Sequence, residues 1–411
     1  MLLKSLPLVF VLTGVALYTV LGGADFGAGF WQLFAGRGQH GQRIRDHAHH
    51  SIGPVWETNH VWLIFVMVIF WTCYPTAFGS IASTLSVPLF IAALGIIFRG
   101  ATYAFKAGAN NSREAGLIDT LFSLSSILTP FALGTVVGGI ASNRVPVGNA
   151  AGHAFTSWLN PTSILTGVLA VTTSAYLAAV WLAADAQRDR DYALDCQFRR
   201  RALGAGAVTG AVAIAGIFVV HADRHKLFHS LLTGRALPAV VASVLAGIFT
   251  LVLVFRRRYQ PARYTAAIAV AAIIAGWALS RWPTILPGLT IRRAAAPHDT
   301  LVAVTICVLG GVIILLPAMG WLFRLALTGR FTTADQTPAP PVTQHLFTTV
   351  TSPATLIRTA IASLIAGTAL LNIADAPWAH TIGILCLAGF MLLGFQAVVF
   401  TTLDGDSSAA G

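Results

Sequence analysis

Charged residues are scarce in this sequence. Only 10% of the 411 residues are Asp, Glu, Lys or Arg, whereas 56% are hydrophobic and the mean hydropathy is +0.74. Soluble domains usually carry about 25% charged residues, so this chain lacks the polar surface that water on all sides requires. Acidic residues are especially few, 15 against 26 Lys and Arg, which gives a formal net charge of +11. The composition excludes an ordinary soluble domain and indicates an integral membrane protein.

Cysteine is also rare. The four cysteines are widely separated, and none belongs to a C-x-x-C pair; they are Cys73, Cys196, Cys307 and Cys386. Disulfide frameworks and zinc sites need cysteines grouped in the sequence or in the fold, so neither is expected here. We expect the four side chains to be buried and chemically inert.

Long apolar segments make up most of the chain. About 20 apolar residues in a helix cross the roughly 30 Å of hydrocarbon in a bilayer. The segments show no alternation of polar and apolar residues, which excludes barrel strands and leaves helices. We therefore predict an all-α, polytopic membrane protein. Its predicted spans are 6–34, 60–78, 81–98, 117–140, 162–184, 203–221, 236–255, 263–280, 300–323, 356–373 and 379–401.

The basic residues lie mainly in every second connection. Those after the odd-numbered spans are Arg37, Arg43, Arg45, Arg99, Lys106, Arg113, Arg188, Arg190, Arg199, Arg200, Arg201, Arg256, Arg257, Arg258, Arg263, Arg324 and Arg330. This alternation is the positive-inside pattern. It predicts an N-terminus outside the cell and places the connections from odd to even spans in the cytoplasm. Because topology accounts for the basic residues, we expect no nucleic-acid partner.

A Thr/Pro-rich polar stretch divides the chain. Residues 1–330 hold nine predicted spans, residues 331–355 form a predicted linker, and residues 356–411 hold two further spans and a polar tail. Clustered Pro and Thr between apolar segments are typical of linkers. The nine spans of the predicted core can form two four-helix bundles with one helix left over.

Asp25 is an acidic residue inside the first predicted span. A charged side chain within a membrane costs at least a few kcal/mol, which makes it a functional candidate. Small residues surround it from Gly22 to Gly29, and they would let another helix backbone approach closely. The carboxylate can relay protons or pair with a buried arginine. The alternative is a structural helix contact in which Asp25 only hydrogen-bonds a neighbour.

Glu57 stands at the start of the second predicted span. Asn59 and His60 follow it, and Trp56 and Trp62 suit a membrane interface. Water still reaches such a position, so a proton path can begin there. The alternative is an ordinary belt of aromatic and polar residues at the interface.

Arg99 ends the third predicted span. Basic residues at an inner helix end normally extend to the interface or contact anionic lipid. The alternative is a special role for Arg99, as a contact to a quinone or to a buried carboxylate. A nearby group of histidines, His47, His49 and His50, has ligand types that suit a metal. Arginines on the same short loop disfavour a cation, so we predict no metal site.

Four blocks of this sequence resemble subunit II of the cytochrome bd quinol oxidases. The blocks are Gly23–Gly29, Ile52–Trp62, Phe98–Gly100, and Leu286–Ile291 with Ala294–Ala296. They occur in the right order and spread across residues 1–330. The resemblance rests on this combination, since no single block would carry it.

The resemblance implies a fold and a function. The fold would be a nine-helix core of two four-helix bundles plus one peripheral helix, in a bacterial cell membrane. The function would be quinol oxidation coupled to reduction of dioxygen to water, with haem b and haem d held by a partner, subunit I. Subunit II would ligate no haem and would support assembly, proton supply and, in some members, a structural quinone. By position, Asp25 and Glu57 match the family's acidic residues, as candidates for proton relay, and Arg99 matches its basic residue.

The sequence also departs from the family pattern. Many members have a second Asp where Gly22 stands here and another acid near Ala104. If those acids line the usual proton route, this chain has a thinner route or none. The two C-terminal spans have no counterpart in the typical subunit; they could shield a lateral surface against lipid or replace a small accessory subunit.

Two other functions fit the same residues. Asp25 and Glu57 inside glycine-interrupted helices would suit a proton-coupled secondary transporter, although no matched pair of broken helices is evident. A purely structural membrane subunit needs neither residue for proton transfer.

Overall fold

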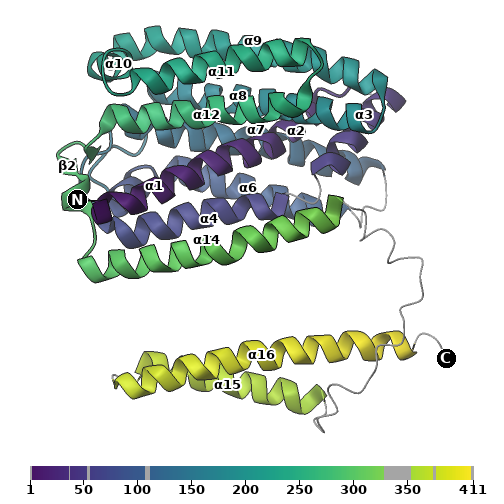
Figure 1. Ribbon diagram of the computed structural model, residues 1–411, viewed down its shortest axis with the longest axis vertical. Coiled ribbons are helices and arrows are strands. Elements are labelled where there is room, and N and C mark those ends of the chain that lie inside the picture. Colours follow the sequence, from purple (N-terminus) through teal and green to yellow (C-terminus); the bar gives the residue numbers. More distant parts are fainter. Residues whose placement is uncertain are drawn as a thin grey trace. The chain divides into compact units, whose positions relative to one another are not determined.

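The computed structural model describes residues 2–36, 38–52, 56–106, 112–327, 353–373 and 376–408 (Figure 1). The chain forms two compact units, Met1–Leu316 and Pro317–Gly411, and each is described by itself. Helices make up nearly all of the described residues. The strands described are β1 (Thr284–Leu286) and β2 (Leu289–Thr290), which pair antiparallel. The predicted all-α, polytopic fold is confirmed.

Long helices account for most of the first unit. Its helices are α1 (Leu2–Leu17), the π-helical turn η1 (Tyr18–Gly22), α2 (Gly23–Leu33), α3 (Gly38–Ile52), α4 (Trp56–Cys73), α5 (Pro75–Thr84), α6 (Ser86–Lys106), α7 (Ser112–Ala141), α8 (Pro161–Arg188), α9 (Tyr192–Asp223), α10 (His225–Leu232), α11 (Leu237–Phe255), α12 (Tyr259–Arg281), α13 (Ile291–Ala294) and the first part of α14 (His298–Leu327). Among the described residues, seven helices are long and apolar enough to cross a membrane, or eight if one bent pair counts as a span. Nine core spans therefore remain a prediction.

Helices α4, α5 and α6 differ from the predicted spans 60–78 and 81–98. Residues 60–78 were expected to form one helix, but α4 ends at Cys73 and α5 begins at Pro75. Proline disfavours a helical conformation in the residue before it and suits the first position of a new helix. The segments Pro75–Thr84 and Ser86–Thr102 then meet at an angle of 82°. The predicted boundary at residue 78 is wrong because Pro75 starts the next helix.

Two buried apolar clusters hold the first unit together. One joins α2, α3, α8, α9, α11 and α12 around residues such as Leu177 and Phe198. The other joins α1, α4, α5, α7 and the β-hairpin around Tyr74 and Leu286. Helix α8 packs against α9, α7 and α2, while α11 packs against α12 and α6 against α7. Helix α14 packs on the second cluster through Leu301, and its segment His298–Leu315 is otherwise largely exposed.

Gly27 lets α2 approach α8 closely. A Cβ atom at this position would lie 1.9 Å from the backbone oxygen of Ser174 and 2.7 Å from the Cβ of Ala178. Any side chain would push the two backbones apart. The expectation that small residues around Asp25 admit a neighbouring helix is confirmed at Gly27.

The cysteines do not all behave as expected. Cys73 is buried, Cys196 and Cys386 are half-buried, and Cys307 is exposed. Cys307 lies on α14, which has few neighbours within the first unit. The expectation of burial is wrong for this residue because its helix packs on the core by one edge only.

The second unit contains a helical hairpin. It consists of α15 (Pro353–Ile373) and α16 (Pro377–Ser408). The helices approach closely at Gly367, where a Cβ atom would lie 2.9 Å from the backbone oxygen of Gly383. The predicted linker, residues 331–355, lies outside the described residues except for 353–355, which begin α15.

Candidate functional site

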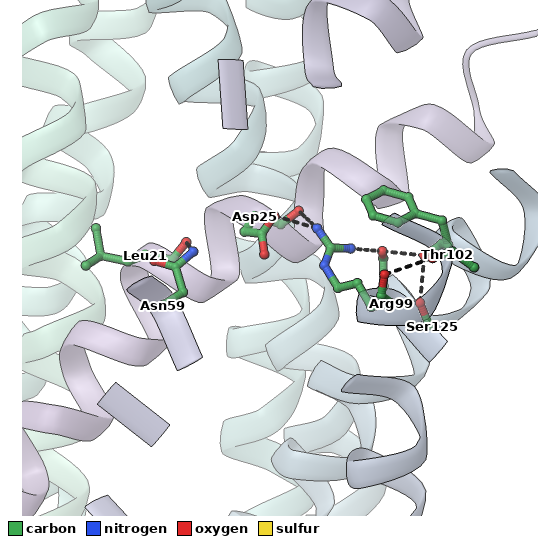
Figure 2. Close-up of polar contacts among 8 residues, drawn as sticks. Leu21, Asp25, Asn59, Arg99, Thr102 and Ser125 are labelled. Carbon is green, nitrogen blue, oxygen red and sulfur yellow. Dashed lines mark hydrogen bonds and ion pairs between the residues drawn. The ribbon is translucent and has the colours of Figure 1, made fainter. Parts of the chain in front are cut away.

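Asp25 and Arg99 form an ion pair in the interior of the first unit (Figure 2). Asp25 is on α2 and Arg99 on α6. Nη2 of Arg99 donates to Oδ1 of Asp25 over 2.5 Å and to the backbone oxygen of Asp25 over 3.0 Å. Both side chains are almost fully buried, at 2% and 3% exposure. Each charge therefore compensates the other where water is excluded.

Arg99 also connects to α7. Its Nη1 donates to Oγ of Ser126, which in turn donates to the backbone oxygen of Phe122 over 2.6 Å. The guanidinium carbon lies 4.2 Å from the ring centroid of Phe122 and 5.1 Å from that of Phe26. Cation–π contacts at these distances attract the guanidinium to both rings. Through one side chain, α2, α6 and α7 are held together.

A second polar contact lies on the other side of Asp25. Asn59, on α4, is buried and donates from Nδ2 to the backbone oxygen of Leu21 over 3.3 Å. Leu21 belongs to the π-helical turn η1. Figure 2 shows Asp25 between this contact and Arg99. The rings of Tyr18, Phe26 and His60 pack beside the contact, with centroids 6.2 to 6.4 Å apart.

The structure brings together two of the three predicted site residues. Glu57 lies in the first turn of α4, and its side chain falls outside the described part of the chain. The same holds for the side chain of Ala104. In the histidine group, Nε2 of His47 lies 3.1 Å from the backbone oxygen of Leu182. Within the described residues no group of three or more His, Cys, Asp or Glu side chains could hold a metal ion.

Sequence reasoning missed two further buried carboxylates. Asp185, near the end of α8, accepts from Nη2 of Arg263 over 2.6 Å. Asp195, in the first turn of α9, accepts from the hydroxyl of Tyr259. Both acids stand among arginines at helix ends, where charged residues normally reach water, so the sequence carried little signal. Their burial depends on the packing of α12 against them.

Comparison with known proteins identifies one family. The profile of "Cytochrome bd terminal oxidase subunit II" matches residues 3–326 and ends before α15. The fold is similar to that of a chain in the structure of bd oxidase from Geobacillus thermodenitrificans, with a TM-score of 0.67. That match covers 80% of this chain and 99% of the other, at 24% identity. At this low sequence identity the similarity supports a common fold and nothing further.

Curated relatives match shorter parts of the chain. Cytochrome bd ubiquinol oxidase subunit 2 of Bacillus subtilis is 27% identical over 39% of this chain and 47% of its own length. Cytochrome bd-I ubiquinol oxidase subunit 2 of Escherichia coli K12 is 26% identical over 52% of this chain and 56% of its own. A putative cytochrome bd menaquinol oxidase subunit II of Bacillus subtilis is 21% identical over 57% and 68%. The chain spans about half the length of the first two relatives.

Proposed function

Because the chain belongs to the cytochrome bd terminal oxidase subunit II family, we propose that it is the non-haem-ligating subunit of a bd-type quinol oxidase. The complex oxidises quinol and reduces dioxygen to water in the aerobic electron transport chain. The profile match over residues 3–326 carries this proposal. Family membership also argues against the alternative of a proton-coupled transporter.

The partner in this proposal is a haem-ligating subunit I that holds haem b and haem d. The relatives support a partner subunit, since their names describe second subunits of ubiquinol and menaquinol oxidases. Membrane lipid contacts the exposed apolar side chains of α9 and α11, such as Phe218 and Ile248. A structural quinone is a further candidate ligand near Arg99.

Proton supply is the proposed task of Asp25 and Glu57. Arg99 engages Oδ1 of Asp25, whereas Oδ2 has no hydrogen-bond partner within the described residues. This second oxygen can accept a proton while Oδ1 keeps its hydrogen bond to Arg99, and the carboxyl is then neutral. Glu57 lies in the first turn of α4, two residues before Asn59, and can deliver protons toward that oxygen. The competing role is structural, since the same ion pair joins α2, α6 and α7.

Topology and domain organisation complete the proposal. The alternation of basic connections supports an N-terminus outside the cell. Residues 1–330 are the oxidase core, and 331–355 connect it to the extension 356–411. This extension follows the matched region, and its two proposed roles are to shield a lateral surface or to replace a small accessory subunit.

A visible absorption spectrum tests the oxidase assignment. The complex captured through this chain in mild detergent should show the bands of reduced haem b and haem d. A gel of the same sample should show a second large subunit. A colourless chain without a partner, from cells that express the whole operon, would reject the assignment and restore the transporter.

Two neutral substitutions separate proton supply from structure. Asp25→Asn and Glu57→Gln should lower oxygen consumption in complexes that keep their haem spectrum. Asp299→Asn is the control, because Asp299 is fully exposed. Loss of assembly in either site variant would assign that residue a structural role instead.

A further inference from the structure

Four buried polar atoms around Asp25 have no hydrogen-bond partner within the described part of the chain. They are Oη of Tyr18, Oδ2 of Asp25, Oδ1 of Asn59 and Nε of Arg99. All four residues are at most 9% exposed. Buried polar groups almost always bond to protein or to ordered water, and an exception requires an explanation. Such a concentration of exceptions points to a bound polar molecule.

Tyr18 extends along its helix toward Asp25. A Cβ atom at Gly22 would lie 3.3 Å from Cε2 and 3.7 Å from Cζ of Tyr18, so the phenol ring covers Gly22. Gly22 lies about one turn before Asp25. The ring centroids of Tyr18 and Phe26 are 6.4 Å apart, and the guanidinium carbon of Arg99 lies 5.1 Å from the same Phe26 ring. The hydroxyl of Tyr18 therefore belongs to the same buried region as the ion pair.

Asn59 reaches this region from α4. Its amide nitrogen donates to the backbone oxygen of Leu21, which leaves its Oδ1 as an acceptor. Leu21 is part of η1, a π-helical turn, and such turns inside α-helices frequently occur at functional sites. In Figure 2, Asn59 lies on the side of Asp25 that is opposite Arg99.

The four atoms differ in what they can bond. Nε of Arg99 only donates, Oδ2 of Asp25 and Oδ1 of Asn59 accept, and the hydroxyl of Tyr18 can do both. Water also donates and accepts, and a buried water needs about two to four polar partners. The positive charge of the Arg99 guanidinium would repel a metal cation, so a metal is disfavoured here.

We propose that Tyr18, Asp25, Asn59 and Arg99 bind buried water, and that Tyr18 and this water carry protons to Oδ2 of Asp25. Water and a phenol each release one proton as they accept another, so neither is left charged. The proton is gained by Oδ2 of Asp25, whose carboxyl becomes neutral while it holds the proton. The proton-carrying role rests on the proposed oxidase function. Binding of the water does not depend on it.

A cryo-EM structure of the purified complex, at a resolution that shows ordered water, tests the site. Density is expected within about 3.2 Å of Oη of Tyr18 and Oδ2 of Asp25. In Tyr18→Phe the ring remains and this density should be lost. The control is Tyr264→Phe, at a residue that is 71% exposed, and it should keep the density. Direct bonds from these atoms to protein side chains, with no water between them, would overturn the proposal.

Turnover tests the role of this water. Quinol-dependent oxygen consumption should fall about tenfold in Tyr18→Phe, with a larger rate difference between H₂O and D₂O, while the haem spectrum and thermal stability stay unchanged. Wild-type turnover and an unchanged isotope effect in this variant would refute the proton role. Absence of haem and oxygen consumption in the wild type would instead reject the oxidase assignment, and the water density would still decide the binding site.

Discussion

The ion pair of Asp25 and Arg99 should behave as one unit in a double-mutant cycle. Asp25→Asn leaves a buried guanidinium without an opposite charge, and Arg99→Met leaves a buried carboxylate. Removing one partner of a buried pair costs about 3–5 kcal/mol of stability. Replacing both residues removes both charges. The double variant should therefore be more stable than the sum of the single effects predicts.

The contacts of Arg99 set the relative magnitudes. Besides the carboxylate, it donates to the backbone oxygen of Asp25 and to Ser126, and it lies over Phe26 and Phe122. We therefore expect Arg99→Met to lower the free energy of unfolding by about 5 kcal/mol and Asp25→Asn to lower it by about 3 kcal/mol. Independent effects would sum to about 8 kcal/mol. With an interaction energy of about 3 kcal/mol, the double variant should cost about 5 kcal/mol.

Thermal unfolding in mild detergent, followed by circular dichroism, measures the cycle. In a large domain 1 kcal/mol shifts the midpoint by about 2 °C, so the single variants should lose about 6 °C and about 10 °C. Arg43→Met is the control, since Arg43 is 59% exposed and its pair with Asp191 is at the surface; it should shift the midpoint by less than about 2 °C. Strictly additive losses in the double variant would refute charge compensation as the reason for the pair.

Two further substitutions test packing and helix capping. Gly27→Ala should destabilise the chain by at least about 1–3 kcal/mol, because its Cβ would meet the backbone of α8; Gly210→Ala, with open space around it, should not lower the unfolding midpoint. Asp191 accepts from the backbone N–H of Leu194 and pairs with Arg43, which holds the pKa of its carboxyl below the usual value. The stabilisation of the folded state by Asp191 should be complete above its unfolded pKa of about 4. It should disappear as the pH falls through the lower pKa of the folded state. Asp191→Asn should remove that part of the acid dependence of the unfolding midpoint, and an unchanged pH profile would contradict the assignment.

Much of the fold follows from the sequence alone. Span length and hydropathy are properties of consecutive residues, and the bilayer requires such segments to form helices. The same reasoning selects Asp25, since an acid inside an apolar span is costly wherever the helix packs. Local rules for proline predict a helix break at Pro75. The apolar residues on both sides of Pro75 instead favour one continuous span, which is why residues 60–78 are predicted as a single helix.

Contacts between distant residues depend on the tertiary structure. Asp25 and Arg99 are 74 positions apart in the sequence. The hydropathy around Arg99 is the same whether its side chain contacts lipid, a quinone or a carboxylate, so hydropathy does not identify the partner. Only the packing of α2, α6 and α7 selects the carboxylate. Tyr18 is a similar case, because an aromatic residue in an apolar span normally packs as a hydrophobe. The Tyr18 ring packs over Gly22, which has no side chain, and α4 approaches the same turn through Asn59. No local pattern in the sequence encodes these two contacts.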